Sequence, residues 1–174
     1  MIDISVSYNR YKFLGYEFLT WIWFLIDKNR ALLSQIDTEL TSLDLGNRVV
    51  LENKVNDAVE SITIKGDDAG LEEGVLALRK GAVVTELNLV YISGSHEWRF
   101  TIKGESFHIA NLKTPETGTV ETGNDIEGMV LEKIFLYDKI VKLIENLYIY
   151  FIKLRISTDW NENVVLPMKD WIHK

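Results

Sequence analysis

The sequence predicts an α+β domain: an antiparallel sheet with a short helix, an N-terminal apolar helix and a long C-terminal helix. Three patterns predict it: helical spacing of apolar residues over residues 13–26, two alternating segments around a Ser-Gly-Ser turn at 93–95, and helical spacing again from residue 126 to 156. With 174 residues, 47% of them hydrophobic, the chain has the size and composition of one ordinary domain. We therefore take residues 1–174 as a single domain.

The N-terminal region is expected to contain a strand and then a helix. Residues 2–7 alternate apolar and polar side chains, which predicts a short strand. The next segment has large apolar residues at steps of four, three and four, namely Leu14, Phe18, Trp21 and Leu25. This spacing predicts a helix, although the density of aromatic residues also permits a buried strand. The segment is shorter than the about 20 residues that a bilayer span needs.

The middle of the chain is expected to contain strands and one short helix. Residues 30–60 read as strand segments broken by polar turns, with the clearest strands at 47–52 and 60–65. A helix is expected over residues 71–80, where Asp68 is positioned to cap the start, glutamates follow in the first turn, and a basic pair precedes a glycine at the end.

A β-hairpin follows that helix. Residues 82–92 and 96–103 alternate apolar and polar side chains on either side of the Ser-Gly-Ser turn. A further short strand is expected over residues 107–112. Residues 113–124 contain proline, glycine and several threonines, and we expect an exposed loop there.

A long helix is expected to begin near Asn124, which would cap it, and to end near residue 156. Its dominant apolar stripe comprises Ile126, Val130, Ile134, Tyr137, Val141, Ile144, Tyr148, Phe151 and Ile152. Further apolar residues beside this stripe leave too little polar surface for packing on one side only. We therefore expect the helix to lie across the sheet and meet another element, or to pack against a second subunit.

Composition narrows the classes of function. The chain has no cysteine, which excludes disulfides, thiolate metal sites and cysteine nucleophiles. Its start lacks the basic and apolar regions of a secretory signal, so we expect a cytoplasmic protein. The formal net charge is −7, and no segment is basic enough to bind nucleic acid by itself. DNA binding therefore requires that scattered basic residues gather in the fold.

No motif predicts catalysis, so we expect no enzyme activity, no cofactor and no metal site. His96 and His108 lie on neighbouring predicted strands, but no third ligand accompanies them. The acidic cluster of Asp67, Asp68 and Glu72 would suit a metal-dependent nuclease. A helix cap and the helix dipole account for the same residues, so the nuclease hypothesis ranks last.

Basic residues on consecutive elements of the middle section are candidates for contacts with nucleic-acid phosphates. They are Lys65, Arg79, Lys80, Arg99 and Lys103. The alternative is a solvated face of mixed charge, since glutamates interrupt the series.

Three tryptophans are candidate stacking platforms for single-stranded bases: Trp21, Trp23 and Trp98. Periodicity assigns Trp21 and Trp98 to the core. Trp23 lies off that face, and its role stays open.

Several motifs follow one another along the middle of the chain: Leu19-Thr20-Trp21-x-Trp23, a Val-Val-Leu-Glu strand, an Ile-x-Ile-Lys strand, and the Gly-x-x-Val-Thr-x-Leu-x-Leu pattern within residues 80–89. In this order they resemble the C-terminal part of the RdgC family of recombination-associated proteins, over residues 14–155. The resemblance implies a homodimer that encircles duplex DNA without sequence preference, associates with the nucleoid and restrains recombinase-driven strand exchange. Better-known members are longer, so a closed ring is not implied here. In the segment that the resemblance places near DNA, only Lys65 is carried over.

Two functions from different classes follow. The first is a non-catalytic, sequence-independent DNA-binding protein of RdgC-like type that acts as a homodimer through its long C-terminal helix. The second is a protein–protein interaction module, of phage or mobile-element type, whose acidic surface meets a basic partner.

Overall fold

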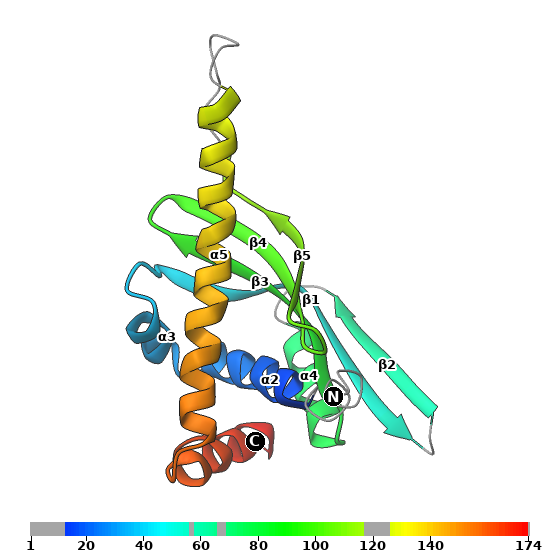
Figure 1. Cartoon of the computed structure of the whole chain (residues 1–174). Coiled ribbons are helices and arrows are strands. Elements are labelled where there is room, and N and C mark those ends of the chain that lie inside the picture. Colours follow the sequence, from blue (N-terminus) through cyan, green and yellow to red (C-terminus); the bar gives the residue numbers. More distant parts are fainter. Residues whose placement is uncertain (1–12, 56–57, 66–68, 117–125, 174) are drawn as a thin grey trace, which may run out of the picture.

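The computed structural model describes residues 13–55, 58–65, 69–116 and 126–173 and has the expected α+β architecture (Figure 1). The strands are β1 (Ser42–Val55), β2 (Ala58–Lys65), β3 (Val83–Ser93), β4 (His96–Lys103) and β5 (His108–Lys113). The helices are α2 (Phe13–Lys28), α3 (Arg30–Ile36), α4 (Ala69–Arg79), α5 (Ile126–Arg155) and α6 (Leu166–His173), with a π-helical turn η1 (Asn161–Val165) before α6. Within these ranges, no helix has the length and apolarity needed to cross a membrane.

The five strands form one sheet in the order β2-β1-β3-β4-β5, and every neighbouring pair is antiparallel. The hairpin of β3 and β4 confirms the strongest strand prediction. Gly94 in its turn has a φ of 60°, a left-handed conformation that glycine adopts without steric cost. The strands predicted at 60–65 and 107–112 are β2 and β5.

The sheet has one face against the core and one face away from it. On β3, Leu87, Leu89 and Tyr91 are fully buried, and the residues between them point to the other side because side chains alternate along a strand. We call these sides the core face and the open face. Helices α2, α4 and α5 pack on the core face.

Helix α2 lies on the core face at the centre of the molecule, in contact with the sheet and with α3, α5 and α6 (Figure 1). Nearly every residue from Phe18 to Ile26 is buried. The ring of Trp21 lies 5.5 Å from that of Phe151 on α5, and the ring of Trp23 lies 5.7 Å from that of Trp171 on α6. A helix that is apolar all round is typical of one surrounded by other elements. The prediction of a helix is confirmed, and Trp23 is a core residue.

Residues 30–36 form helix α3, so the prediction of strand structure there was wrong. Leu32 and Leu33 lie four and three residues before Ile36, which is helical spacing, and Leu33 is buried. A run this short does not distinguish a helix from a strand by its period.

Strand β1 is longer than the predicted strand at 47–52 because its pairing with β3 continues past a bulge between Leu45 and Val49. A second register shift, between Val50 and Leu51, leaves the extra residue Thr85 on β3. The first bulge is held by the side chain of Asn88, whose Oδ1 accepts a hydrogen bond from the backbone N of Asn47 at 3.2 Å. The strand expected at 2–7 and the helix caps expected at Asp68 and Asn124 lie outside the described residues.

The two halves of α5 have different surroundings. Its C-terminal half packs on α2, and the buried residues of the whole helix are Leu136, Ile140, Leu143, Ile144, Leu147 and Phe151. Its N-terminal half extends past the edge of the sheet (Figure 1), and no residue from 126 to 135 is buried. The helix was predicted correctly, but the first part of its dominant stripe is exposed.

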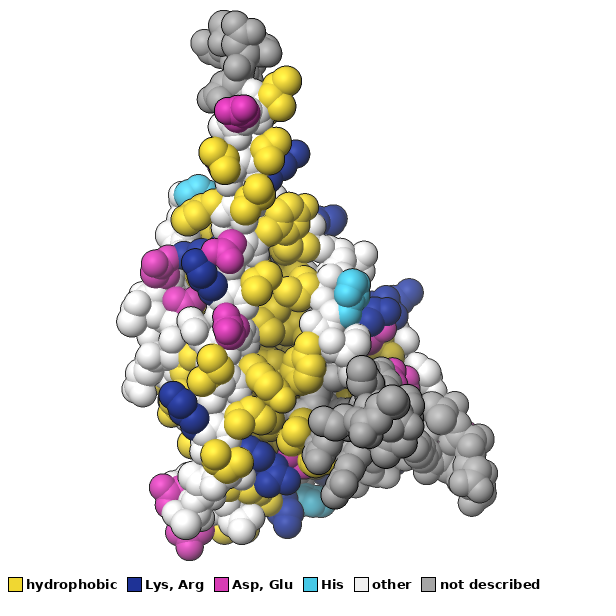
Figure 2. All heavy atoms as spheres, viewed as in Figure 1, with side chains coloured by type: hydrophobic (Ala, Val, Ile, Leu, Met, Phe, Trp, Pro, Cys, Tyr) yellow, Lys and Arg dark blue, Asp and Glu magenta, His cyan; other side chains and the backbone are white. Residues whose placement is uncertain are grey.

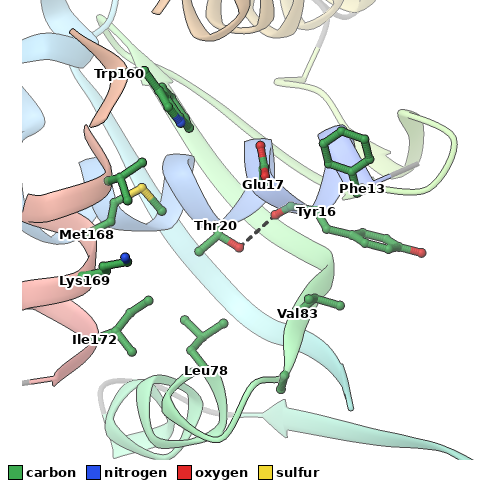
Figure 3. Close-up of a pocket in the computed structure, with 12 residues that line it drawn as sticks. Phe13, Tyr16, Glu17, Thr20, Leu78, Val83, Trp160, Met168, Lys169 and Ile172 are labelled. Atoms are coloured by element: carbon green, nitrogen blue, oxygen red, sulfur yellow. Dashed lines mark hydrogen bonds between the residues drawn. The ribbon is translucent and has the colours of Figure 1, made fainter. Parts of the chain in front are cut away.

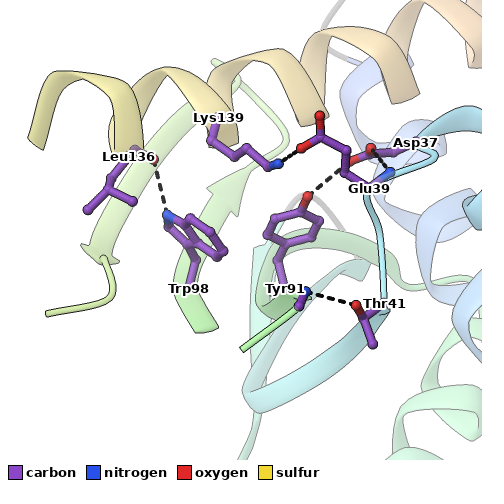
Figure 4. A network of polar contacts seen from close by, with 8 residues as sticks. Asp37, Glu39, Thr41, Tyr91, Trp98, Leu136 and Lys139 are labelled. Atoms are coloured by element: carbon purple, nitrogen blue, oxygen red, sulfur yellow. Dashed lines mark hydrogen bonds and ion pairs between the residues drawn. The ribbon is translucent and has the colours of Figure 1, made fainter. Parts of the chain in front are cut away.

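The sheet holds α5 where its two halves meet (Figure 4). The indole Nε1 of Trp98 on β4 donates a hydrogen bond to the carbonyl oxygen of Leu136 at 3.1 Å, and this bond is buried. One turn further along, Lys139 forms an ion pair with Glu39 in the loop before β1. These two contacts set the direction in which the N-terminal half leaves the body.

The loop that carries Glu39 is itself fixed to the end of β3 (Figure 4). The hydroxyl of Tyr91 donates to Oδ2 of Asp37 at 3.1 Å, and Oδ1 of the same carboxylate accepts from the backbone N of Glu39 at 3.0 Å. Burial raises the pKa of Tyr91 to about 12. The hydroxyl therefore stays protonated, and keeps this bond, over the neutral pH range.

Candidate functional site

The structure brings three of the five predicted phosphate-binding residues to one surface. Lys65, Arg99 and Lys103 lie on the open face of the sheet, because each alternates with a buried core-face residue on its own strand. All three are exposed.

The other two predicted residues, Arg79 and Lys80, lie at the end of α4 in the helical layer. The packing of α4 shows which layer this is, since a Cβ placed on Gly74 would lie 2.9 Å from Cδ1 of the core-face residue Ile64. Arg79 has a structural contact: its Nε donates to the carbonyl oxygen of Ile172 on α6 at 2.9 Å. The five residues therefore do not form one cluster.

Arg48 on β1 belongs with the open-face residues, although it is not among the five residues predicted from the sequence. It lies directly opposite Lys65 in the sheet register. Glu86 on β3 accepts ion pairs from both Arg48, at 3.3 Å, and Lys103, at 3.4 Å. These side chains border a polar hollow of about 280 Å³ on the open face. Arg48 lies inside the strand predicted at 47–52, and the pairing of β1 with β2 has no bulge, so alternation along that strand could have placed it on the open face.

The open face carries mixed charge. Its basic residues are Arg48, Lys65, Arg99, Lys103 and Lys113. Its acidic residues, including one in the turn after β4, are Asp44, Glu52, Glu86, Glu97 and Glu105. Arg99 is also paired with Glu97 at 2.6 Å. The face is therefore less negative than the chain as a whole, but it does not concentrate positive charge.

The described residues contain no group of three or more His, Asp or Glu side chains that could hold a metal ion. His96 begins β4, whereas His108 pairs with Lys103 at its other end, so the two predicted neighbours do not face each other. Asp67 and Asp68 lie outside the described residues, and Glu72 is exposed on α4.

The tryptophans considered for base stacking are in the core. The exposed fractions of Trp21, Trp23 and Trp98 are 1%, 1% and 3%. Stacking on a base requires an exposed ring face, so these three residues do not supply it.

The most unusual surface is an apolar one that begins on the projecting N-terminal half of α5 and continues to Val141, on a different side of the helix from the buried residues Leu136 and Ile140 (Figure 2). Four side chains of this surface lie at steps of four, three and four, and we call them the exposed stripe: Val130 (50% exposed), Ile134 (56%), Tyr137 (47%) and Val141 (49%). Leu131 and Phe135 beside the stripe are 66% and 67% exposed. Contiguous apolar surface of this kind marks an interaction site in soluble proteins.

Charged residues flank the exposed stripe on both sides. Lys133 lies on one flank, and Asp138 lies on the other, five residues further along. Among the described residues Lys133 has no ion-pair partner, and Asp138 pairs with Lys142 on the same helix at 2.7 Å. An exposed pair of that kind contributes little and exchanges easily.

No model of a known protein family matches this chain, and no curated protein matches it. The resemblance to the RdgC family therefore stays a prediction from the motifs.

Proposed function

We propose that the protein is a non-catalytic interaction module that works as a homodimer, joined through the exposed stripe of α5. The observation that carries this proposal is the stripe itself. Val130, Ile134, Tyr137 and Val141 repeat at the spacing of alternate core positions in a coiled coil, and the first two belong to a segment, 126–135, in which no residue is buried.

A second copy suits this stripe better than an unrelated partner, because it presents the same residues at the same spacing. In a parallel, in-register pair, each residue of the stripe packs against the same residue of the second chain. The apolar side chains of both chains are then removed from water. The flanks then become complementary, since Lys133 of one chain comes next to the partner's Asp138, five residues further on. Ile126 and Leu131 have the same five-residue relation, so apolar contacts extend the seam.

The absence of cysteine from the chain makes a direct crosslinking test possible. In the parallel pair, Val130→Cys and Val141→Cys should each form a disulfide with itself under mild oxidation, giving a species of twice the chain mass. Glu132→Cys, on the opposite side of the same helix turn, is the matched control and should not crosslink. A disulfide requires Cα atoms within about 7 Å.

An antiparallel pair would give a different pattern, with disulfides only when Val130→Cys and Val141→Cys are mixed. That result would reject the parallel arrangement. If neither single variant nor the mixture crosslinks above the Glu132→Cys control, the homodimer proposal is wrong.

Sequence-independent DNA binding of RdgC-like type is the second candidate function. The observation that favours it is the presence of Lys65, Arg99 and Lys103 on one open face together with Arg48 and Lys113. Such residues would contact phosphates without reading sequence. Two-fold symmetry would double this surface in a dimer.

Salt dependence tests this second candidate. Duplex affinity should fall steeply between low and moderate salt, because each neutralised phosphate releases counterions. Lys65→Gln with Arg99→Gln should weaken binding and reduce the slope of log affinity against log salt by about 2. Lys80→Gln, in the other layer, is the control and should leave the slope unchanged. A flat salt response would remove DNA binding.

A further inference from the structure

A solvent-accessible cavity lies between α2, α4 and the C-terminal tail (Figure 3). Its volume is about 390 Å³, within the range of small-molecule sites in proteins. Three separate parts of the chain build it, namely the start of α2, the segment from the end of α4 to the start of β3, and the tail from Trp160 to Ile172.

Most of the cavity wall is apolar. Trp160, Met168 and Ile172 project from the tail, and Leu78 and Val83 line the opposite side (Figure 3). Such a lining favours the hydrocarbon part of a ligand, because burying apolar surface releases it from water.

The tail that forms one wall is held in place by two polar contacts outside the cavity. Nε1 of Trp171 donates to Oδ2 of Asp27 on α2 at 2.7 Å. The guanidinium of Arg79 reaches the carbonyl oxygen of Ile172 from α4. A wall tied to two neighbouring helices makes the cavity preformed, which lowers the entropic cost of binding.

The polar groups of the wall differ in whether they are already paired. The hydroxyl of Thr20 donates to the carbonyl oxygen of Tyr16 at 2.8 Å. The carboxylate of Glu17 accepts from Nε of Arg155 at 2.8 Å, so its charge is balanced. Lys169 points into the cavity (Figure 3) and has no carboxylate partner among the described residues. The cavity therefore presents one uncompensated positive charge to a ligand.

We propose that this cavity binds a small amphiphile with one carboxylate, its hydrocarbon part against Trp160, Met168 and Val83 and its carboxylate at Nζ of Lys169. A charge-assisted contact with the ammonium satisfies the anion, and the apolar wall accepts the chain. The site is independent of the exposed stripe on α5, so the two proposals stand or fall separately.

Titration calorimetry with octanoate and its neutral analogue 1-octanol tests the proposal. Octanoate should bind one per chain. Lys169→Met, which keeps the length of the side chain and removes its charge, should weaken octanoate by about three- to tenfold and leave 1-octanol within about twofold. Lys153→Met, an exposed lysine of α5 that does not line the cavity, is the matched control and should change neither.

Two further measurements locate the hydrocarbon part. From hexanoate to octanoate, affinity should rise by about fourfold for each added methylene. Val83→Phe replaces a small side chain at a partly exposed position of the wall by a bulky aromatic ring, and should weaken the binding of octanoate and of 1-octanol alike. The proposal is overturned if octanoate does not bind the wild-type chain, if Lys169→Met weakens both ligands equally, or if a folded Val83→Phe variant binds both as the wild type does.

Discussion

The two halves of α5 are similarly apolar in sequence and lie in different surroundings. In the C-terminal half, the stripe contacts α2, and Phe151 is fully buried among aromatic rings. In the N-terminal half, the same stripe continues without a described element to cover it. Apolar periodicity therefore predicts that a helix face is buried, but it does not predict whether the residues that bury it belong to the same chain or to another one.

The length of α5 together with its direction across the strands explains why the sheet covers only part of the helix. Helix α5 has 30 residues and is about 45 Å long, whereas β3 has 11 residues and is about 36 Å long. The helix also crosses the sheet obliquely (Figure 1). A helix that is apolar beyond the reach of its own sheet is exposed unless it associates, which is the basis for the proposed dimer.

The largest expected effect is a difference in the free energy of unfolding lost when a phenylalanine is truncated in each half of α5. Phe151→Ala should lower the free energy of unfolding by about 3–5 kcal/mol, because it leaves a cavity among the rings of Phe18 and Trp21. Phe135→Ala makes the same change on the exposed half and should cost less than about 0.5 kcal/mol in dilute protein. Urea unfolding measures both, and equal losses would contradict the difference between the halves.

The next effect concerns association. Ile134→Asp would place a charge in the seam of the proposed dimer and should weaken self-association by about 2–5 kcal/mol. Ile149→Asp is the matched control, since Ile149 is also exposed (44%) but lies off the stripe. Sedimentation equilibrium measures the dissociation constants. Equal effects of the two variants would show that the stripe has no special role.

A smaller effect is expected at the junction between the halves. Burial raises the pKa of Tyr91 to about 12, whereas an unfolded tyrosine titrates near about 10. Because the folded pKa is the higher one, this group's contribution is fully present below about pH 10 and is lost as pH rises toward about 12. Tyr91→Phe cannot ionise, so its stability should fall less over this window. Urea unfolding at pH 9 to 12 compares the wild type with Tyr91→Phe. If the stabilities of the two proteins fall in parallel with pH, the raised pKa of Tyr91 is contradicted.

The smallest effect is the loss of one hydrogen bond at the same junction. Trp98→Phe removes the bond from Nε1 to the carbonyl oxygen of Leu136 while keeping an aromatic ring, and should cost about 1–2 kcal/mol. Hydrogen exchange should become faster for amides near Leu136 and stay unchanged near Phe151. Uniform acceleration along α5 would mean that this bond does not define the boundary.

Much of the fold follows from local patterns in the sequence. The hairpin of β3 and β4 is visible because apolar residues alternate on both sides of a glycine turn, and α4 is visible because its charges match the helix dipole. Helix α3 was missed because seven residues hold too few apolar positions to define a period.

The candidate sites depend on tertiary contacts that no local pattern contains. Arg79 and Lys80 belong to a basic series in the sequence, but α4 packs on the face opposite Lys65 and Arg99. The cavity around Lys169 combines three segments that are far apart in the chain, ending or beginning at Thr20, Leu78, Val83 and Trp160, so spacing could not predict it. The stripe of α5 was visible in full, and only the structure shows which half of it is exposed.

The most direct test of the dimer proposal is the mass of the unmodified protein in solution, measured by sedimentation equilibrium over a range of concentrations. We predict a reversible approach to twice the chain mass as the concentration rises to about 100 µM, with an association constant that Ile134→Asp lowers and Ile149→Asp does not. A single species of chain mass throughout that range would contradict the claim that the exposed stripe joins two copies.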